Sequence, residues 1–205
     1  MLIKRIELEN FRVFKGKHEI KFTTDEKKNV TVIMGDNGAG KTTLAQAFLW
    51  CLYGENDFKN KEMLNLVTKS ELEPQELAKV RVAVDVMHEG IAYYIARAQK
   101  YQKDYNGKVV SAAPTLEVFK IEDGKRTPYN SLDSELVVKK MLPQELSQFF
   151  FFDGERIRGL SEELEKGKSK GFANAVRQLV GLTAMMNAIE HLKPSKTASL
   201  VGIYN

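Results

Sequence analysis

The chain has 205 residues, of which 43% are hydrophobic and 28% charged, and 31 basic against 27 acidic residues leave a net charge of +4. This composition is ordinary for a soluble globular domain with its own core, and the mild positive charge permits an anionic partner without demanding one. The single cysteine, Cys51, excludes an intrachain disulfide framework, and we expect it to be buried and inert. The N-terminus has no apolar signal-peptide core, and no run reaches the roughly 18 apolar residues of a membrane span. These features predict a cytoplasmic protein with no membrane partner.

The N-terminal part of the chain is predicted to contain three strands and a helix. Residues 2–9 and 17–22 alternate polar and apolar side chains, as half-buried strands do. The β-branched apolar run 29–34 predicts a strand that is buried on both faces. A glycine-rich turn follows, and residues 41–53 then have the apolar spacing of a helix that stops at Gly54.

The middle of the chain is predicted to form an antiparallel β subdomain. It follows a polar, irregular stretch at 55–70, and the pairs Glu89-Gly90 and Asn106-Gly107 mark turns within it. Its strand-like segments are 78–88, 91–101 and 115–123.

The last third of the chain is predicted to be mainly helical. Residues 131–141 have helical spacing, and Pro143 suits the first position of a further short helix. The four phenylalanines at 149–152 predict a short buried strand. Apolar spacings of three and four residues make 183–193 the expected start of a coiled-coil helix, or else the last amphipathic helix of the domain, and 194–205 is an irregular tail.

The turn after the third predicted strand has the chemistry of a phosphate cradle. Gly35, Gly40, Lys41 and Thr42 fill the pattern G-x-x-x-x-G-K-[ST], between a strand and a helix as that motif requires. Glycines let the backbone N–H groups point inward at phosphate oxygens, and the helix adds its positive end. The nucleotide-binding residues predicted here are Asp36, Asn37, Gly38, Ala39, Gly40, Lys41, Thr42 and Thr43.

Two of these residues have a predicted role in chemistry. The Lys41 ammonium is expected to reach the terminal phosphates, and the Thr42 hydroxyl to hold Mg²⁺, which prefers oxygen ligands. No base-reading N/T-K-x-D motif for guanine occurs, so ATP is the expected nucleotide.

Hydrolysis also needs an acidic group at the metal and a group that orients water. Asp85 lies inside an alternating strand and is predicted to face solvent. The remaining candidates follow the phenylalanine run: Asp153 on the metal and Glu155 polarising water, which would make a self-sufficient site. The other interpretation is a plain turn after a core segment.

The segments "IELENFRVFKG", "MGDNGAGKTTL" and "LSQFFFFDGERI" resemble the ATPase heads of SMC-like proteins. The resemblance runs from residue 1 to about 192, and it is strongest to the DNA sulfur modification protein DndD and broader to RecF and SbcC. It implies an α/β P-loop NTPase of the ABC/SMC type, with 1–182 as the N-terminal lobe. It also implies that Arg12 approaches the nucleotide, with Asn10 and Phe11 shaping that turn.

The resemblance implies a second possible role for Asp153. In SbcC-like heads a Gln-Gly-Glu loop contacts Mg²⁺ and the attacking water, and here Asp153-Gly154-Glu155 stands in its place. Both roles for Asp153 remain open. The signature motif, the Asp-Glu strand and the histidine switch of the family are not found here, and His18, His88 and His191 match none of them.

The resemblance therefore implies a head completed by a C-terminal lobe and by homodimerisation around two ATP molecules. This chain would then bind ATP with little turnover, while the whole protein would be an ATPase of DNA processing, in particular DNA phosphorothioate modification, with DNA or DNA-modification proteins as partners. A self-contained NTPase and an SbcC/RecF-like DNA-repair ATPase are the alternatives. The candidate basic sites for DNA are Lys59, Lys61, the region 97–103, Lys166, Lys168 and Lys170, and a solvated surface is the favoured interpretation of each.

Overall fold

The structure is a computed structural model, and it describes residues 1–56, 58 and 60–151. The expectations for Phe152, for Asp153 and Glu155, for the helices after residue 161 and for the tail fall outside these residues. Within the described ranges, no helix has the length and apolar character needed to cross a bilayer.

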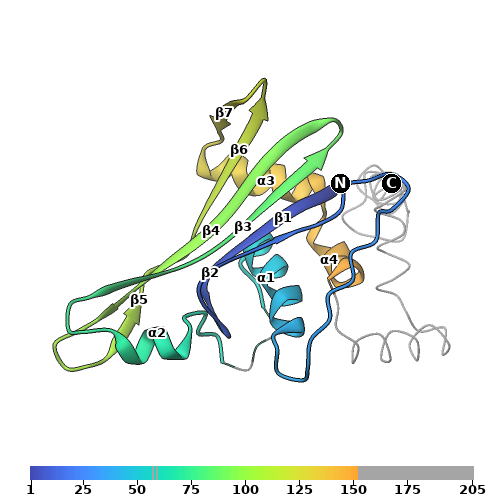
Figure 1. Cartoon of the computed structure of the whole chain (residues 1–205). Helices are drawn as coiled ribbons and strands as arrows, with labels where there is room; N and C mark the ends of the chain where they lie inside the picture. Colours follow the sequence, from blue (N-terminus) through green and yellow to red (C-terminus); the bar gives the residue numbers. More distant parts are fainter. Residues whose placement is uncertain (57, 59, 152–205) are drawn as a thin grey trace, which may run out of the picture. The chain divides into compact units, whose positions relative to one another are not determined.

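One antiparallel sheet forms the centre of the described part (Figure 1). Its strands run in the order β2-β1-β3-β4-β6-β7, and β5 pairs with β4 at one end. This confirms the predicted antiparallel subdomain and extends it to the N-terminal hairpin. The strands are β1 (Leu2–Phe11), β2 (Phe14–Lys21), β3 (Leu77–His88), β4 (Ile91–Lys103), β5 (Val109–Ser111), β6 (Thr115–Glu122) and β7 (Lys125–Pro128).

The long β3–β4 hairpin follows directly from its sequence. Glu89 and Gly90 connect the two strands, and both have positive φ, 51° and 79°, as the tight primed hairpin turns require. Val80, Val82 and Val84 occupy alternate positions and are at most 1% exposed. The period of two therefore gives the sheet one apolar inner face.

Helices cover that inner face. The α1 helix (Lys41–Tyr53) packs against β3 and β4, the α3 helix (Ser131–Met141) packs against β6, and the two helices contact each other. The bounds of both helices confirm the prediction. Gly54 ends α1 with φ 74°, and its N–H donates to the Trp50 carbonyl at 2.9 Å. The short helices α2 (Leu66–Glu71) and α4 (Gln144–Phe150) complete the described part.

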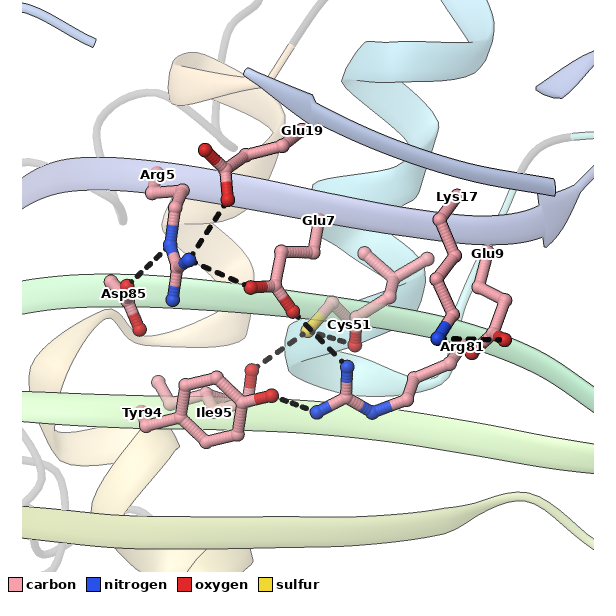
Figure 2. A network of polar contacts seen from close by, with 11 residues as sticks. Arg5, Glu7, Glu9, Lys17, Glu19, Cys51, Arg81, Asp85, Tyr94 and Ile95 are labelled. Carbon is pink, nitrogen blue, oxygen red and sulfur yellow. Dashed lines mark hydrogen bonds and ion pairs between the residues drawn. The ribbon is translucent and has the colours of Figure 1, made fainter. Parts of the chain in front are cut away.

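The outer face of the sheet carries a network of ion pairs (Figure 2). Arg5 on β1 contacts Asp85 at 2.7 Å and Glu19 at 2.9 Å. The hydrogen bond from Arg5 is the main reason why the pKa of Glu19 is lowered. Arg81 stacks over the Tyr94 ring at 5.5 Å and bonds its hydroxyl. The charged side chains of these ion pairs are partly exposed, so each ion pair contributes little stability.

The predicted buried strand at 29–34 is wrong. These residues pair with none of the strands of the sheet, and Val30, Val32 and Met34 are 77%, 76% and 90% exposed. A β-branched run encodes the extended conformation and a preference for burial, but a strand also needs a neighbour that takes up its backbone hydrogen bonds. None of the described strands pairs with this run.

The prediction of a strand at 149–152 is also wrong for its first half. The α4 helix begins after Pro143, its N-cap, and continues to Phe150. The Phe151 N–H then donates to the Ser147 carbonyl at 2.8 Å, and its ring stacks on Phe48 of α1 at 5.1 Å. An apolar run of four residues has no readable period, so a helix start just upstream decides its conformation.

The charged side chain of Arg97 is buried, although its basic neighbours in the sequence suggest a surface position. Arg97 on β4 is 6% exposed and donates to the carbonyls of Cys51 at 3.1 Å and Leu52 at 3.3 Å. It thus satisfies carbonyls at the C-terminal end of α1, so Arg97 is neither a solvated surface residue nor the candidate DNA contact of the 97–103 region. Lys103 donates to the Leu72 carbonyl, whereas Lys100 is exposed.

Candidate phosphate-binding site

The loop 35–40 joins the exposed run 29–34 to the start of α1, and its glycines fit the predicted cradle. Gly38 and Gly40 have φ of 87° and 101°, a region that side chains with a Cβ rarely adopt. Gly40 also lies under the turn between β1 and β2. A Cβ at Gly40 would come within 2.8 Å of Val13 Cγ2 and 3.0 Å of Phe14 Cζ. The motif therefore requires glycine at this position for both its φ and its packing.

The start of α1 is open to an anion. Gly40 is the N-cap and offers no side-chain acceptor, and the first turn contains no acidic residue. The first intrahelical bond is donated by Leu44 to the Gly40 carbonyl, at 2.8 Å. The N–H groups of Lys41, Thr42 and Thr43 come before it and have no acceptor within the helix. Together with the helix dipole they make a site for phosphate.

Lys41 turns back onto the loop that precedes it. Its Nζ donates to the Gly35 carbonyl at 2.5 Å and to the Asp36 carbonyl at 2.8 Å. The Asp36 carbonyl also accepts from the Ala39 N–H at 3.1 Å, which closes the turn. Lys41 is exposed, so phosphate oxygens can replace these carbonyls as its acceptors without any rearrangement of the core.

The two threonines of the motif have different environments. Thr42 is exposed and its hydroxyl is available to a metal-bound nucleotide, whereas Thr43 is 8% exposed and packs in the core. Mg²⁺ in nucleotide sites needs only one or two protein oxygens, because phosphates and waters complete its octahedron. Thr42 fits this requirement. Across 1–56, 58 and 60–151, no cluster of three or more His, Cys, Asp or Glu residues could hold a metal by itself.

None of the acidic residues considered for catalysis is described at the phosphate loop. Asp153 and Glu155 lie outside the described residues, so both of their predicted roles stay predictions. Asp85 lies on the outer face of β3, as expected, and its carboxylate accepts from Arg5 Nε at 2.7 Å. It is therefore an ion-pair residue of the sheet.

Arg12 is held by the segment that precedes α2. Its guanidinium lies 4.3 Å from the centre of the Phe58 ring, and Nη1 donates to the carbonyls of Glu62 at 2.8 Å and Asn60 at 3.3 Å. The backbone of Arg12 has φ 54°. Asn10 has φ 51° and shapes the turn as expected, whereas the second residue with a positive φ is Arg12 and not Phe11. A contact between Arg12 and nucleotide stays a prediction.

The stretch 55–70 is more ordered than its polar sequence predicts. It contains a bridge between Leu64 and Phe11 and the α2 helix, with Asn65 as its N-cap. The signal was present as an asparagine followed three positions later by Thr68, since asparagine is among the preferred N-cap residues.

Comparisons with known proteins found one family model, a curated relative and a similar solved structure. The sequence model of a family described as an AAA domain matches residues 5–199. The chromosome partition protein Smc of Fusobacterium nucleatum subsp. nucleatum is 33% identical over 90 residues, which are 42% of this chain and 7% of that protein. The SMC head domain from Thermotoga maritima has 21% identity and a TM-score of 0.36, over 65% of this chain and 40% of that one. The chain thus spans less than half of the length of either relative.

Proposed function

Because this chain belongs to the AAA domain family, we propose that it binds ATP with Mg²⁺ on the loop 35–43 as part of an SMC-like ATPase head. The observation that supports this most directly is the open N-terminus of α1, where Gly40 provides no cap and Lys41 is bonded only to exposed loop carbonyls. Backbone N–H groups, a dipole and one mobile cation are the parts with which P-loops bind a triphosphate.

We propose that hydrolysis is completed by groups from outside these 205 residues. The described residues contain no cluster of three or more His, Cys, Asp or Glu that could hold a metal, and the exposed run 29–34 has the composition of a strand that another lobe would cover. In the SMC-like arrangement this lobe is the C-terminal one, and head dimerisation closes the site around two ATP molecules. The chain by itself then binds ATP with little or no turnover.

A thermal melt of the 205-residue chain with and without ATP–Mg²⁺ tests binding. Nucleotide at 100 times its dissociation constant stabilises by about 2.7 kcal/mol, which raises the melting temperature by roughly 5–10 °C for a domain of this size. Lys41→Ala is the matched control and is expected to remove the shift. A wild-type melt that ignores ATP–Mg²⁺ would contradict the proposal.

The second candidate is a self-contained NTPase that uses Asp153 and Glu155. It is supported by the order of these residues after the phenylalanine run, and it predicts steady ATP turnover by this chain alone. Glu155→Gln should then abolish turnover and retain binding. If the wild-type chain binds ATP without turnover, this candidate fails and the completed-head proposal stands.

The biological setting is proposed to be DNA processing. One relative is named a chromosome partition protein, and the resemblance to DndD supports the narrower proposal of DNA phosphorothioate modification. Disruption of the gene in its native host tests the narrower proposal, since loss of phosphorothioate from genomic DNA is expected only under it. Unchanged phosphorothioate, or DNA that contains none, would leave an SbcC/RecF-like repair role as the better setting.

A further inference from the structure

The turn between β1 and β2 is held in an unusual backbone conformation by the segment that precedes α2. Asn10 and Arg12 both have positive φ, which costs energy for residues other than glycine. The Arg12 N–H donates to the Met63 carbonyl and the Asn65 N–H donates to the Asn10 carbonyl, both at 2.8 Å. Such a conformation persists only where neighbouring contacts fix it.

One buried side chain joins this turn to the helix that follows. Asn65 is 4% exposed, and its Nδ2 donates to the Arg12 carbonyl at 2.5 Å. Its Oδ1 accepts from the N–H groups of Val67 at 3.1 Å and Thr68 at 3.0 Å, which caps α2. The same amide therefore caps a helix with its oxygen and fixes the turn with its nitrogen.

A second amide supports the turn from the other side. Asn10 Oδ1 accepts from the Gly16 N–H at 2.9 Å and from the Thr68 hydroxyl at 3.2 Å. Its Nδ2 donates to the Lys79 carbonyl of β3 at 3.2 Å. The turn is thus connected to β2, to β3 and to α2 by side-chain amides.

The fixed turn bears directly on the phosphate loop. Val13 and Phe14 follow Arg12, and their side chains would lie 2.8 Å and 3.0 Å from a Cβ at Gly40. Gly40 is the N-cap of α1, where the open N–H groups begin. A shift of the turn would therefore move the groups that press on the start of the cradle, and it would also move the Arg12 guanidinium.

We propose that Asn65 is a positioning residue for the nucleotide site: through the Arg12 carbonyl it holds the β1–β2 turn against Gly40 and so sets the shape of the cradle. This inference rests on the proposed binding of ATP at the loop 35–43. Asn65 does not itself touch the loop, and its effect on nucleotide is transmitted by the backbone of the turn.

Asn65→Asp separates the helix cap made by the side-chain oxygen from the hydrogen bond that the side-chain nitrogen donates to the turn. Aspartate keeps an oxygen for the Val67 and Thr68 N–H groups, but it loses the donor and sets an oxygen against the Arg12 carbonyl. Asn130→Asp is the matched control. Asn130 caps α3 by accepting from the Asp133 N–H at 2.9 Å, and its Nδ2 donates to the Asp133 carboxylate at 2.7 Å, so the same chemical change occurs at an element away from the loop.

The measurement is the dissociation constant of ATP–Mg²⁺ for the 205-residue chain, well below the melting temperature. Asn65→Asp is expected to weaken binding about tenfold, the effect of one lost hydrogen bond with an unpaired buried acceptor, and Asn130→Asp to leave it within about twofold. Asn65→Ser, which still caps but is too short to reach the Arg12 carbonyl, should weaken binding in the same direction and serves if the aspartate variant does not fold.

A double-mutant cycle distinguishes positioning from general destabilisation. Val13→Ala removes the Cγ2 that lies nearest to Gly40. If Asn65 acts by holding the turn against Gly40, its effect on the dissociation constant shrinks in the Val13→Ala background, whereas independent effects would multiply. Wild-type affinity in both the Asn65→Asp and Asn65→Ser variants, with binding still lost in Lys41→Ala, would overturn the positioning role alone. A wild-type chain that does not bind ATP–Mg²⁺ would overturn the proposed function and this inference together.

Discussion

The Lys41 ammonium lies 2.5 Å from the carbonyl oxygen of Gly35, the first residue of the motif to which both belong. The residue that is expected to meet the terminal phosphates is thus folded onto its own loop, with a second acceptor at Asp36. Because these acceptors are exposed and neutral, a triphosphate can replace them and gain a charge-assisted hydrogen bond in doing so.

Lys41→Ala is expected to leave the folded chain almost as stable as wild type and to remove its response to nucleotide. Exposed hydrogen bonds to loop carbonyls contribute little, so the free energy of unfolding without ligand should change by less than about 0.5 kcal/mol. Lys41→Arg should recover only part of the response, because the two cations have different shapes. Denaturant titrations with and without ATP–Mg²⁺ measure both quantities, and a Lys41→Ala chain that is still stabilised by ATP would contradict the assignment.

Gly40→Ala is expected to destabilise the chain more than Gly38→Ala. Both positions have positive φ, which costs an alanine roughly 1–2 kcal/mol. At Gly38 a Cβ would meet nothing within 4 Å, whereas at Gly40 it would press on Val13 and Phe14, at a further cost of about 1–3 kcal/mol. Urea unfolding of the two variants gives the difference directly. Equal destabilisation would show that the β1–β2 turn does not press on the loop.

Cys51 is expected to resist alkylation in the folded chain. The thiol is fully buried, and burial is the main reason why its pKa is raised to about 12. Since the thiolate is the reactive form, iodoacetamide at pH 8 should modify it only after unfolding. Mass spectrometry of native and urea-treated samples checks this, and rapid modification of the native chain would contradict the buried position.

The same pKa shift predicts a loss of stability at alkaline pH. The unfolded thiol releases its proton near its usual pKa of 9.0, whereas the folded thiol keeps it to about 12, so the folded state binds more protons between these values. The contribution of the Cys51 thiol to the free energy of unfolding is therefore complete below pH 9, and it is lost as the pH rises toward 12. Other groups titrate in this range, so the measurement is the difference between wild type and Cys51→Ala, whose alkaline decline should be shallower. Parallel declines would contradict the prediction.

Arg97→Met is expected to destabilise the chain by about 2–4 kcal/mol. The guanidinium satisfies the Cys51 and Leu52 carbonyls at the end of α1, and burial lowers its pKa. Methionine would fill much of the volume but would leave buried carbonyls without a donor. Lys100 lies on the same strand and is exposed, so Lys100→Met is the control. It should change the free energy of unfolding by less than about 0.5 kcal/mol. Similar effects of the two substitutions in urea unfolding would show that Arg97 is not a structural cap.

Local patterns were enough to predict much of the fold and the centre of the candidate site. The α1 helix was predicted with its observed bounds at 41–53, because apolar spacing and Gly54 are both local signals. The β3–β4 hairpin followed from alternation and the Glu89-Gly90 pair. The glycines and Lys41 of the cradle were readable for the same reason, since a phosphate loop is built from one short stretch of backbone.

The tertiary structure decided whatever depends on a partner distant in sequence. The run 29–34 has the composition of a buried strand and is exposed, because no described strand pairs with it. Arg97 looked like surface charge and is buried, because the end of α1 offers it carbonyl acceptors. Asn65 looked like part of a loop and instead connects α2 to the turn above Gly40. Period and turn chemistry are encoded within a few residues, whereas hydrogen-bond partners and burial are set only when distant segments meet.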